Sequence, residues 1–179
     1  GAKLWDVDGN EWLDVTMGFG VHLFGLSPPF VTEAVEAQLK RGIAIGPQSD
    51  IAGEIAEMIC DFTGMERVTF CNTGSEAVLG SLRAARTVTG RNRVVLFAGD
   101  YHGINDEVLV RSHMLKGRRM SSPIAPGIPS EMVHNMTVLD YGQPESLGFI
   151  ESEAQNLAAV IVEPVQARRR SEERRVGKE

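Results

Sequence analysis

Two short apolar runs flank a turn dipeptide near the start of the chain. Residues 4–7 and 12–15 are rich in Leu, Trp and Val, and Asp8-Gly9 lies between them. An Asp-Gly pair tolerates the positive φ angles that a tight hairpin turn requires. The pattern therefore predicts a small β-hairpin at the N-terminal end of the sequence.

Apolar residues then recur at helical spacing in two segments. The first follows Ser27 and the pair Pro28-Pro29, which suit the first turn of a helix, and it ends at Gly42. The second begins near residue 50 and ends before Gly64, where glycine is typical of a helix C-terminus. We expect two helices here.

Beyond residue 67, short β-rich runs alternate with helical patterns. The runs cover residues 68–71, 93–97 and 158–162, and the helical patterns cover 75–89 and 144–156. Such alternation indicates an α/β fold with a mostly parallel sheet flanked by helices. Residues 111–134 contain three prolines and two glycines, which predicts a long surface loop.

The composition is that of an ordinary globular protein. The 179 residues are 42 % hydrophobic and 23 % charged. No apolar run approaches the roughly 18 to 20 residues that cross a membrane, so we expect no membrane partner and a cytoplasmic location by default. The two cysteines lack metal-ligand spacing, which predicts buried free thiols and no metal site.

The net charge of -6 hides a basic C-terminal tail. Residues 1–166 hold 12 Lys and Arg against 21 Asp and Glu, whereas residues 167–179 hold 6 against 3. The tail lacks aromatic residues for stacking, which disfavours a nucleic-acid partner. Residues 170–179 resemble the translation of a common sequencing adapter, so we expect a non-native tail there. Gly1 in place of a methionine fits the expectation of a gene fragment open at both ends.

The first candidate site is a glycine turn that leads into a helix. Thr73 and Glu76 stand at capping-box spacing on either side of Gly74 and Ser75. Backbone N–H groups and the positive helix end there would bind a phosphate, with Ser75 adding a hydroxyl donor. Neither a Walker loop nor a dinucleotide-binding glycine motif is present. On the pattern alone, a capped helix without a ligand is the commoner case.

Two further motifs follow later strands. Tyr101-His102-Gly103 offers rings that can lie against a planar heterocycle, and the alternative is an exposed loop histidine. Glu163 follows an apolar strand and needs a partner or ligand, unless it is a solvent-facing residue that caps the next turn. Ligands of α/β sheets gather beyond the carboxyl ends of the strands, where all three motifs are expected.

In order and spacing, these motifs resemble the class III aminotransferases. These are fold-type I enzymes dependent on pyridoxal 5'-phosphate (PLP), and they include glutamate-1-semialdehyde aminomutase. The resemblance extends from the hairpin at residues 4–11 to about Arg169. It implies a partial type I PLP-dependent transferase fold, in which residues 1–45 belong to the small domain and 46–169 to part of the large PLP-binding domain.

The resemblance also assigns roles to single residues. The family holds the cofactor phosphate at the position of Thr73-Gly74-Ser75, and an aromatic residue at the position of Tyr101 packs on the pyridine ring. His102 is the neighbour of that aromatic residue in the family's Y-H-G element. Glu163 matches the acid of the family's E-P motif near the cofactor.

The catalytic residues of the family have no counterpart in this sequence. The lysine that forms the Schiff base and the aspartate that pairs with the ring nitrogen both belong downstream of the E-P motif. None of the four lysines lies in a matching context; they are Lys3, Lys40, Lys116 and Lys178. We therefore name no catalytic residue and expect this chain alone to be inactive.

The resemblance implies transfer of an amino group from a small-molecule donor to a carbonyl acceptor, by a homodimeric parent enzyme. Residues 17–25, 125–129 and 165–169 look more closely like the aminotransferase domains of polyketide synthases and nonribosomal peptide synthetases, whose acceptor is a β-ketoacyl thioester on an acyl carrier protein. One alternative is a glutamate-1-semialdehyde aminomutase-like enzyme. Another is a non-catalytic module that binds a phosphate ligand.

Overall fold

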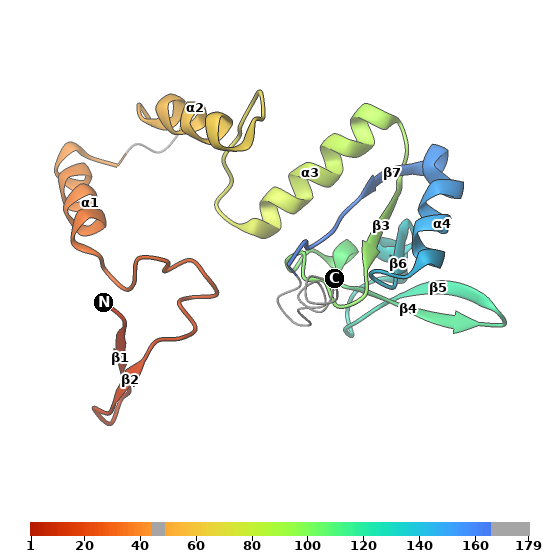
Figure 1. Ribbon diagram of the computed structural model, residues 1–179, viewed down its shortest axis with the longest axis horizontal. Coiled ribbons are helices and arrows are strands. Elements are labelled where there is room, and N and C mark those ends of the chain that lie inside the picture. Colours follow the sequence, from red (N-terminus) through yellow and green to blue (C-terminus); the bar gives the residue numbers. More distant parts are fainter. Residues whose placement is uncertain (44–48, 166–179) are drawn as a thin grey trace, which may run out of the picture. The chain divides into compact units, whose positions relative to one another are not determined.

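The computed structural model describes residues 1–43 and 49–165 (Figure 1). The chain forms two compact units, Gly1–Val68 and Thr69–Glu179. The domain boundary expected between residues 45 and 46 falls outside the described residues and stays a prediction. The tail at 170–179, expected to be non-native, also lies outside them.

The first unit begins with the predicted hairpin. Strands β1 (Lys3–Trp5) and β2 (Glu11–Leu13) pair antiparallel. In the turn, the Asp6 carboxylate accepts hydrogen bonds from the Asn10 side chain at 3.0 Å and from the Trp12 indole N–H at 2.9 Å. These bonds, that of Asn10 first, lower the pKa of Asp6 to about 2. The prediction of a hairpin is confirmed.

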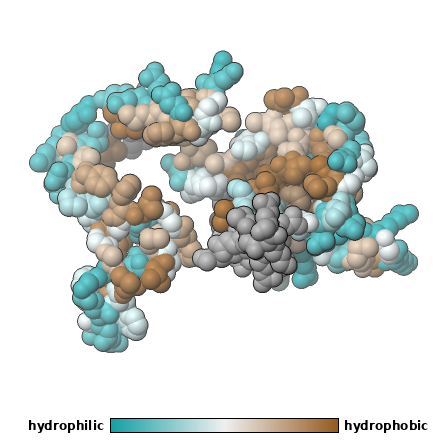
Figure 2. All heavy atoms as spheres, in the orientation of Figure 1, coloured by the Kyte–Doolittle hydropathy of each residue, from teal (hydrophilic) through white to brown (hydrophobic). Residues whose placement is uncertain are grey.

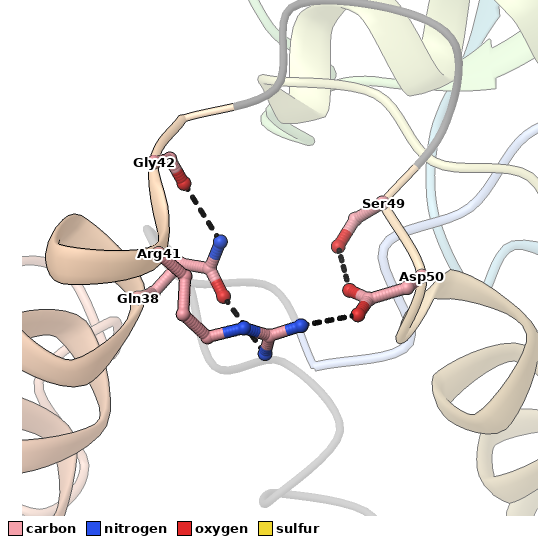
Figure 3. Close-up of polar contacts among 5 residues, drawn as sticks. All are labelled: Gln38, Arg41, Gly42, Ser49 and Asp50. Atoms are coloured by element: carbon pink, nitrogen blue, oxygen red, sulfur yellow. Dashed lines mark hydrogen bonds and ion pairs between the residues drawn. The ribbon is translucent and has the colours of Figure 1, made fainter.

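Both predicted helices of this unit are present. Helix α1 spans Pro29–Arg41 and helix α2 spans Ala52–Thr63, and each is followed by a glycine with positive φ. Between them, an Arg41 guanidinium nitrogen lies 2.6 Å from the Asp50 carboxylate (Figure 3). The hydrogen bond and charge of Arg41 lower the pKa of Asp50. Both side chains are exposed, so this pair adds little to stability.

A parallel sheet forms the centre of the second unit. Strands β3 (Arg93–Phe97), β6 (Met136–Leu139) and β7 (Leu157–Val160) lie in the order β6-β3-β7, and β3 is parallel to both neighbours. The sheet confirms the predicted α/β architecture. Strand β6, which was not predicted, has only four residues and gives a weak pattern.

Alternate residues of β3 face two separate apolar clusters. Val94 and Leu96 pack with Leu82 of helix α3 (Gly74–Thr89). Their neighbours in the strand pack instead with side chains of helix α4 (Pro144–Glu153). The ribbon shows α3 and α4 on either side of the strands (Figure 1). Because both faces are covered, β3 is apolar from Val94 to Phe97.

The long loop predicted for residues 111–134 is wrong in its first part. Strands β4 (Val110–Leu115) and β5 (Arg118–Pro123) form an antiparallel hairpin. The two turn residues, Lys116 and Gly117, both have positive φ, at 50° and 78°. Turns with two positive φ angles match the twist of a hairpin.

Side chains of this hairpin donate hydrogen bonds to backbone carbonyls of β6 that point away from β3. Arg119 donates to the Val138 carbonyl at 3.0 Å, and the Ser121 hydroxyl donates to the Met136 carbonyl. No described strand forms ladder hydrogen bonds with this side of β6. The hairpin is therefore held by tertiary contacts that a polar sequence such as RRMSSP does not reveal.

Two smaller expectations are also wrong. Residues 68–71 are not a strand, because no described strand pairs with them. Both cysteines are free, as expected, but Cys71 is exposed and Cys60 is only partly buried. Within residues 1–43 and 49–165, no helix is long and apolar enough to span a bilayer.

An apolar surface lies on the second unit between α3 and α4, brown in Figure 2. Strand β7, an edge of the described sheet, runs through this region in Figure 1. Val160 and Val162, on and just beyond β7, are 41 % and 45 % exposed. This edge of the sheet is apolar.

Candidate functional site

The ends of two neighbouring strands bring two of the sequence motifs together. Strands β3 and β7 are parallel and adjacent, so their carboxyl ends lie at the same edge of the sheet. One further ladder bond, from Ile161 N–H to the Val95 carbonyl at 2.8 Å, continues the pairing toward that edge. The segment that holds Tyr101 follows β3, and Glu163 follows β7.

Asp100 and Glu163 bind each other's segments reciprocally. The Glu163 N–H donates to the Asp100 carboxylate at 2.9 Å, and the Tyr101 N–H donates to the Glu163 carboxylate at 3.2 Å. The Glu163 carboxylate thus has the partner that its place at a strand end requires. Sequence reasoning missed Asp100, because an acid after a strand and a glycine reads as an ordinary turn residue.

His102 is buried beside the same carboxylate. Its side chain is only 8 % exposed, and its Nε2 atom lies 3.6 Å from a carboxylate oxygen of the fully buried Asp100 side chain. Burial lowers the pKa of His102, while the charges of Asp100 and Glu163 oppose that shift. The imidazole is therefore mainly neutral at pH 7. The alternative of an exposed loop histidine is wrong.

The predicted capping box begins helix α3. The Glu76 N–H donates to the Thr73 hydroxyl at 3.2 Å, and the Glu76 carboxylate accepts from the N–H groups of Thr73 at 2.9 Å and Asn72 at 2.8 Å. A capping box satisfies the orphan donors of a first helical turn in this reciprocal way. Its carboxylate is therefore occupied by backbone donors.

Two backbone donors remain at this helix end. In the described part of the chain, the N–H groups of Gly74 and Ser75 have no hydrogen-bond acceptor. They point from the positive end of the helix dipole, an arrangement that binds anions. The hydroxyls of Thr73 and Ser75 each accept one bond already and keep a proton to donate.

Ser75 also joins the helix start to the segment after β3. Its hydroxyl accepts from the Ile104 N–H at 3.1 Å, and its carbonyl accepts from the Asn105 side chain at 2.7 Å. Gly103 is packed against it, because a Cβ atom added there would lie 2.4 Å from the Ser75 hydroxyl oxygen. All three sequence motifs thus meet at one edge of the sheet, and Asn105 is a further contact that sequence reasoning missed.

Comparison with known proteins assigns the family. Residues 1–169 match the family model described as Aminotransferase class-III. The chain belongs to the class-III aminotransferase family. It is 39 % identical over 167 residues to a glutamate-1-semialdehyde 2,1-aminomutase of Desulfitobacterium hafniense, an alignment that covers 92 % of this chain and 39 % of that protein.

Solved transaminase structures share the fold. An omega-transaminase from Sphaerobacter thermophilus is 31 % identical with a TM-score of 0.85, and the match covers 93 % of this chain and 40 % of that one. A transaminase with PLP bound is 32 % identical with a TM-score of 0.83, covering 93 % and 39 %. The predicted fold and the PLP dependence of its family are confirmed. The chain spans about two fifths of the length of these relatives.

No described lysine lies on the elements that form this candidate site. Lys3 is on β1, Lys40 is on α1, and Lys116 is in the β4–β5 turn. Lys178 lies outside the described residues. Among residues 1–43 and 49–165, no group of three or more His, Cys, Asp or Glu is placed to hold a metal ion.

Proposed function

We propose that this chain supplies the cofactor-holding part of a PLP-dependent aminotransferase. The two unpaired N–H groups of Gly74 and Ser75, beside the segment of Tyr101, carry this proposal. When bound, the pyridine ring of the cofactor accepts the electrons released at the substrate carbon. The residues of this chain bind and orient that ring.

The phosphate half of the site fits a dianion. The N–H groups of Gly74 and Ser75 would donate to the phosphate oxygens, and the hydroxyls of Thr73 and Ser75 would add two donors. The capping carboxylate of Glu76 is bound to backbone donors on the preceding residues. It therefore accepts from the N–H groups of Asn72 and Thr73 and leaves the donors proposed for the phosphate unused.

The ring half of the site is held from the segment after β3. Tyr101 is 49 % exposed, so much of its side chain is open to a planar ligand. Its backbone is tied to Glu163, which fixes where the side chain begins. The imidazole of His102, in the same segment, is buried and neutral, so it adds no charge near the ring.

We further propose that the parent enzyme is a homodimer that takes its amino group from a small-molecule donor in the cytoplasm. A chain that lacks the Schiff-base lysine would hold the cofactor without transferring an amino group, because in the family that lysine moves the proton between substrate and cofactor. Binding without turnover is also what a non-catalytic module would show, so the parent reading frame decides between the two.

For the acceptor, we propose a β-ketoacyl thioester on an acyl carrier protein. The sequence patterns at residues 17–25, 125–129 and 165–169 support this choice. The 39 % identity to a glutamate-1-semialdehyde 2,1-aminomutase favours the alternative of an aminomutase-like enzyme. Long-read sequencing of the source DNA across the codon for Arg170 separates them. Flanking carrier-protein domains support the first, and a free-standing gene contradicts it.

Binding of pyridoxamine phosphate (PMP), the amine form of the cofactor, tests the cofactor site. PMP needs no Schiff base, so its affinity reports only the residues present. We expect Ser75→Ala to weaken PMP binding about tenfold in equilibrium dialysis. Ser81→Ala is the matched control, because Ser81 lies in the same helix and its hydroxyl bonds only the Ala77 carbonyl.

The two variants show whether the Ser75 hydroxyl binds the cofactor phosphate or only belongs to the first turn of helix α3. Equal affinity of the two variants and the unchanged chain for PMP would contradict the proposal. Circular dichroism of each variant checks that helix α3 is retained. Competition by inorganic phosphate would place the bound PMP at a phosphate site.

A further inference from the structure

We infer that Asp100, which lies outside the residues proposed to touch the cofactor, is the positioning residue for the ring half of the site. This inference rests on the proposed function. Asp100 joins the segment after β3 to the segment after β7, and through Glu163 it sets the backbone from which Tyr101 projects.

The burial of Asp100 is the first reason. Its side chain has no exposed surface, and a buried carboxylate costs free energy unless hydrogen bonds compensate. It accepts the Glu163 N–H at 2.9 Å and lies 3.6 Å from the His102 ring nitrogen. A turn after a β-strand forms without a buried acid. We therefore attribute the buried position of Asp100 to its contacts with the neighbouring segments.

The reciprocity of the contacts is the second reason. Asp100 holds the backbone of Glu163, and Glu163 in turn holds the backbone of Tyr101. The two carboxylates thus close a ring of contacts across the ends of β3 and β7. Loss of the Asp100 carboxylate removes the acceptor of the Glu163 N–H, so the Glu163 carboxylate is no longer held beside the Tyr101 N–H.

The far end of the same segment is anchored independently. Gly103 packs on Ser75, and the Ile104 N–H donates to the Ser75 hydroxyl. Asp100 takes no part in these contacts. Removing its carboxylate should therefore loosen the segment at Tyr101 and leave the phosphate donors at the start of α3 in place.

The test compares two ligands on the full 179-residue chain. We expect Asp100→Ala to weaken PMP binding about tenfold and to change inorganic phosphate binding by less than about twofold. Asp100→Asn keeps an oxygen for the Glu163 N–H, so its PMP affinity should stay within about threefold of the unchanged chain. Asp140→Ala is the control, because Asp140 follows β6 at the same sheet edge but binds Arg119.

The titration of His102, followed by NMR, gives a second readout. Asp100 and Glu163 are the charged groups that act on this ring from the ends of β3 and β7. Asp100→Asn removes one of these charges, so the pKa of His102 should fall further while PMP binding is largely kept. This shift tests the 3.6 Å contact between the two side chains, whereas the PMP and phosphate affinities of Asp100→Ala test the positioning role.

Each outcome decides the inference. Unchanged PMP affinity in Asp100→Ala overturns it, and so does a parallel loss of PMP and phosphate binding. If Asp100→Ala does not fold, an unchanged His102 titration in Asp100→Asn overturns it instead. Failure of the unchanged chain to bind PMP overturns the proposed function first, and the inference with it. If the unchanged chain binds PMP and Asp140→Ala loses that binding, then removing any acid at this edge of the sheet weakens PMP binding. That result also overturns the inference.

Discussion

A Cβ atom on Gly103 would lie 2.4 Å from the hydroxyl oxygen of Ser75, closer than two such atoms can approach. Gly103 also has a φ of +95°, where residues with a side chain are strained. The contact joins the Tyr101 segment to the start of helix α3. Any side chain at this position pushes the two apart.

Gly103→Ala should therefore lower the free energy of unfolding of the second unit by about 2 kcal/mol or more and weaken PMP binding. Gly127→Ala is a matched control, because Gly127 has a φ of +90° with open space around it. It should cost only about 1 kcal/mol, the backbone strain alone. Equal losses in urea unfolding would contradict the close packing on Ser75.

Thr73→Ala should remove the cap of helix α3. The variant loses the acceptor of the Glu76 N–H, so we expect about 1 kcal/mol less stability in urea unfolding. Thr87→Ala, in the same helix, loses only a hydroxyl bond to the Arg83 carbonyl and should stay within about 0.5 kcal/mol of the unchanged chain. Thr73→Ser should restore most of the difference, and its failure to do so would exclude the capping role.

Glu107→Gln should destabilise the second unit. Glu107 pairs with Arg86 of helix α3 at 2.8 Å, and the two side chains are 13 % and 25 % exposed. Breaking a sheltered, charge-assisted contact costs about 1 to 3 kcal/mol. Glu153→Gln breaks a more exposed pair with Arg93 and should cost less than about 1 kcal/mol. The order of the two urea midpoints tests the difference in burial.

The stability of the second unit should fall as the pH drops below about 6.5, the ordinary pKa of histidine. Burial holds the pKa of folded His102 below that value, so the unfolded chain takes up the proton first. Acidification therefore favours unfolding until the lower folded pKa is passed. Urea midpoints at pH 7.5 and 5.5 measure this, and His102→Gln should reduce the dependence.

Local sequence patterns determined much of the fold. The Asp8-Gly9 turn, the glycines after α1 and α2 and the capping box at Thr73 and Glu76 act within a few residues of themselves. Their physics does not depend on distant parts of the chain, so the structure has each element where the pattern predicts it.

Elements that depend on a partner were the ones that sequence reasoning misjudged. Residues 68–71 favour a strand, but no described strand pairs with them. The β4–β5 hairpin has a polar sequence, and it is held partly because Arg119 and Ser121 donate to carbonyls of β6. Strand formation requires a neighbour, which the propensity of a segment cannot supply.

The candidate site divides in the same way. The sequence by itself determined which residue types stand at the strand ends and helix start, because motif and spacing are local. Only the tertiary structure decided that Asp100 is buried, that it binds the segment of Glu163, and that Gly103 packs on Ser75. These contacts join residues 28 to 63 positions apart, and the parallel pairing of β3 with β7 and the packing of α3 against the sheet bring them together.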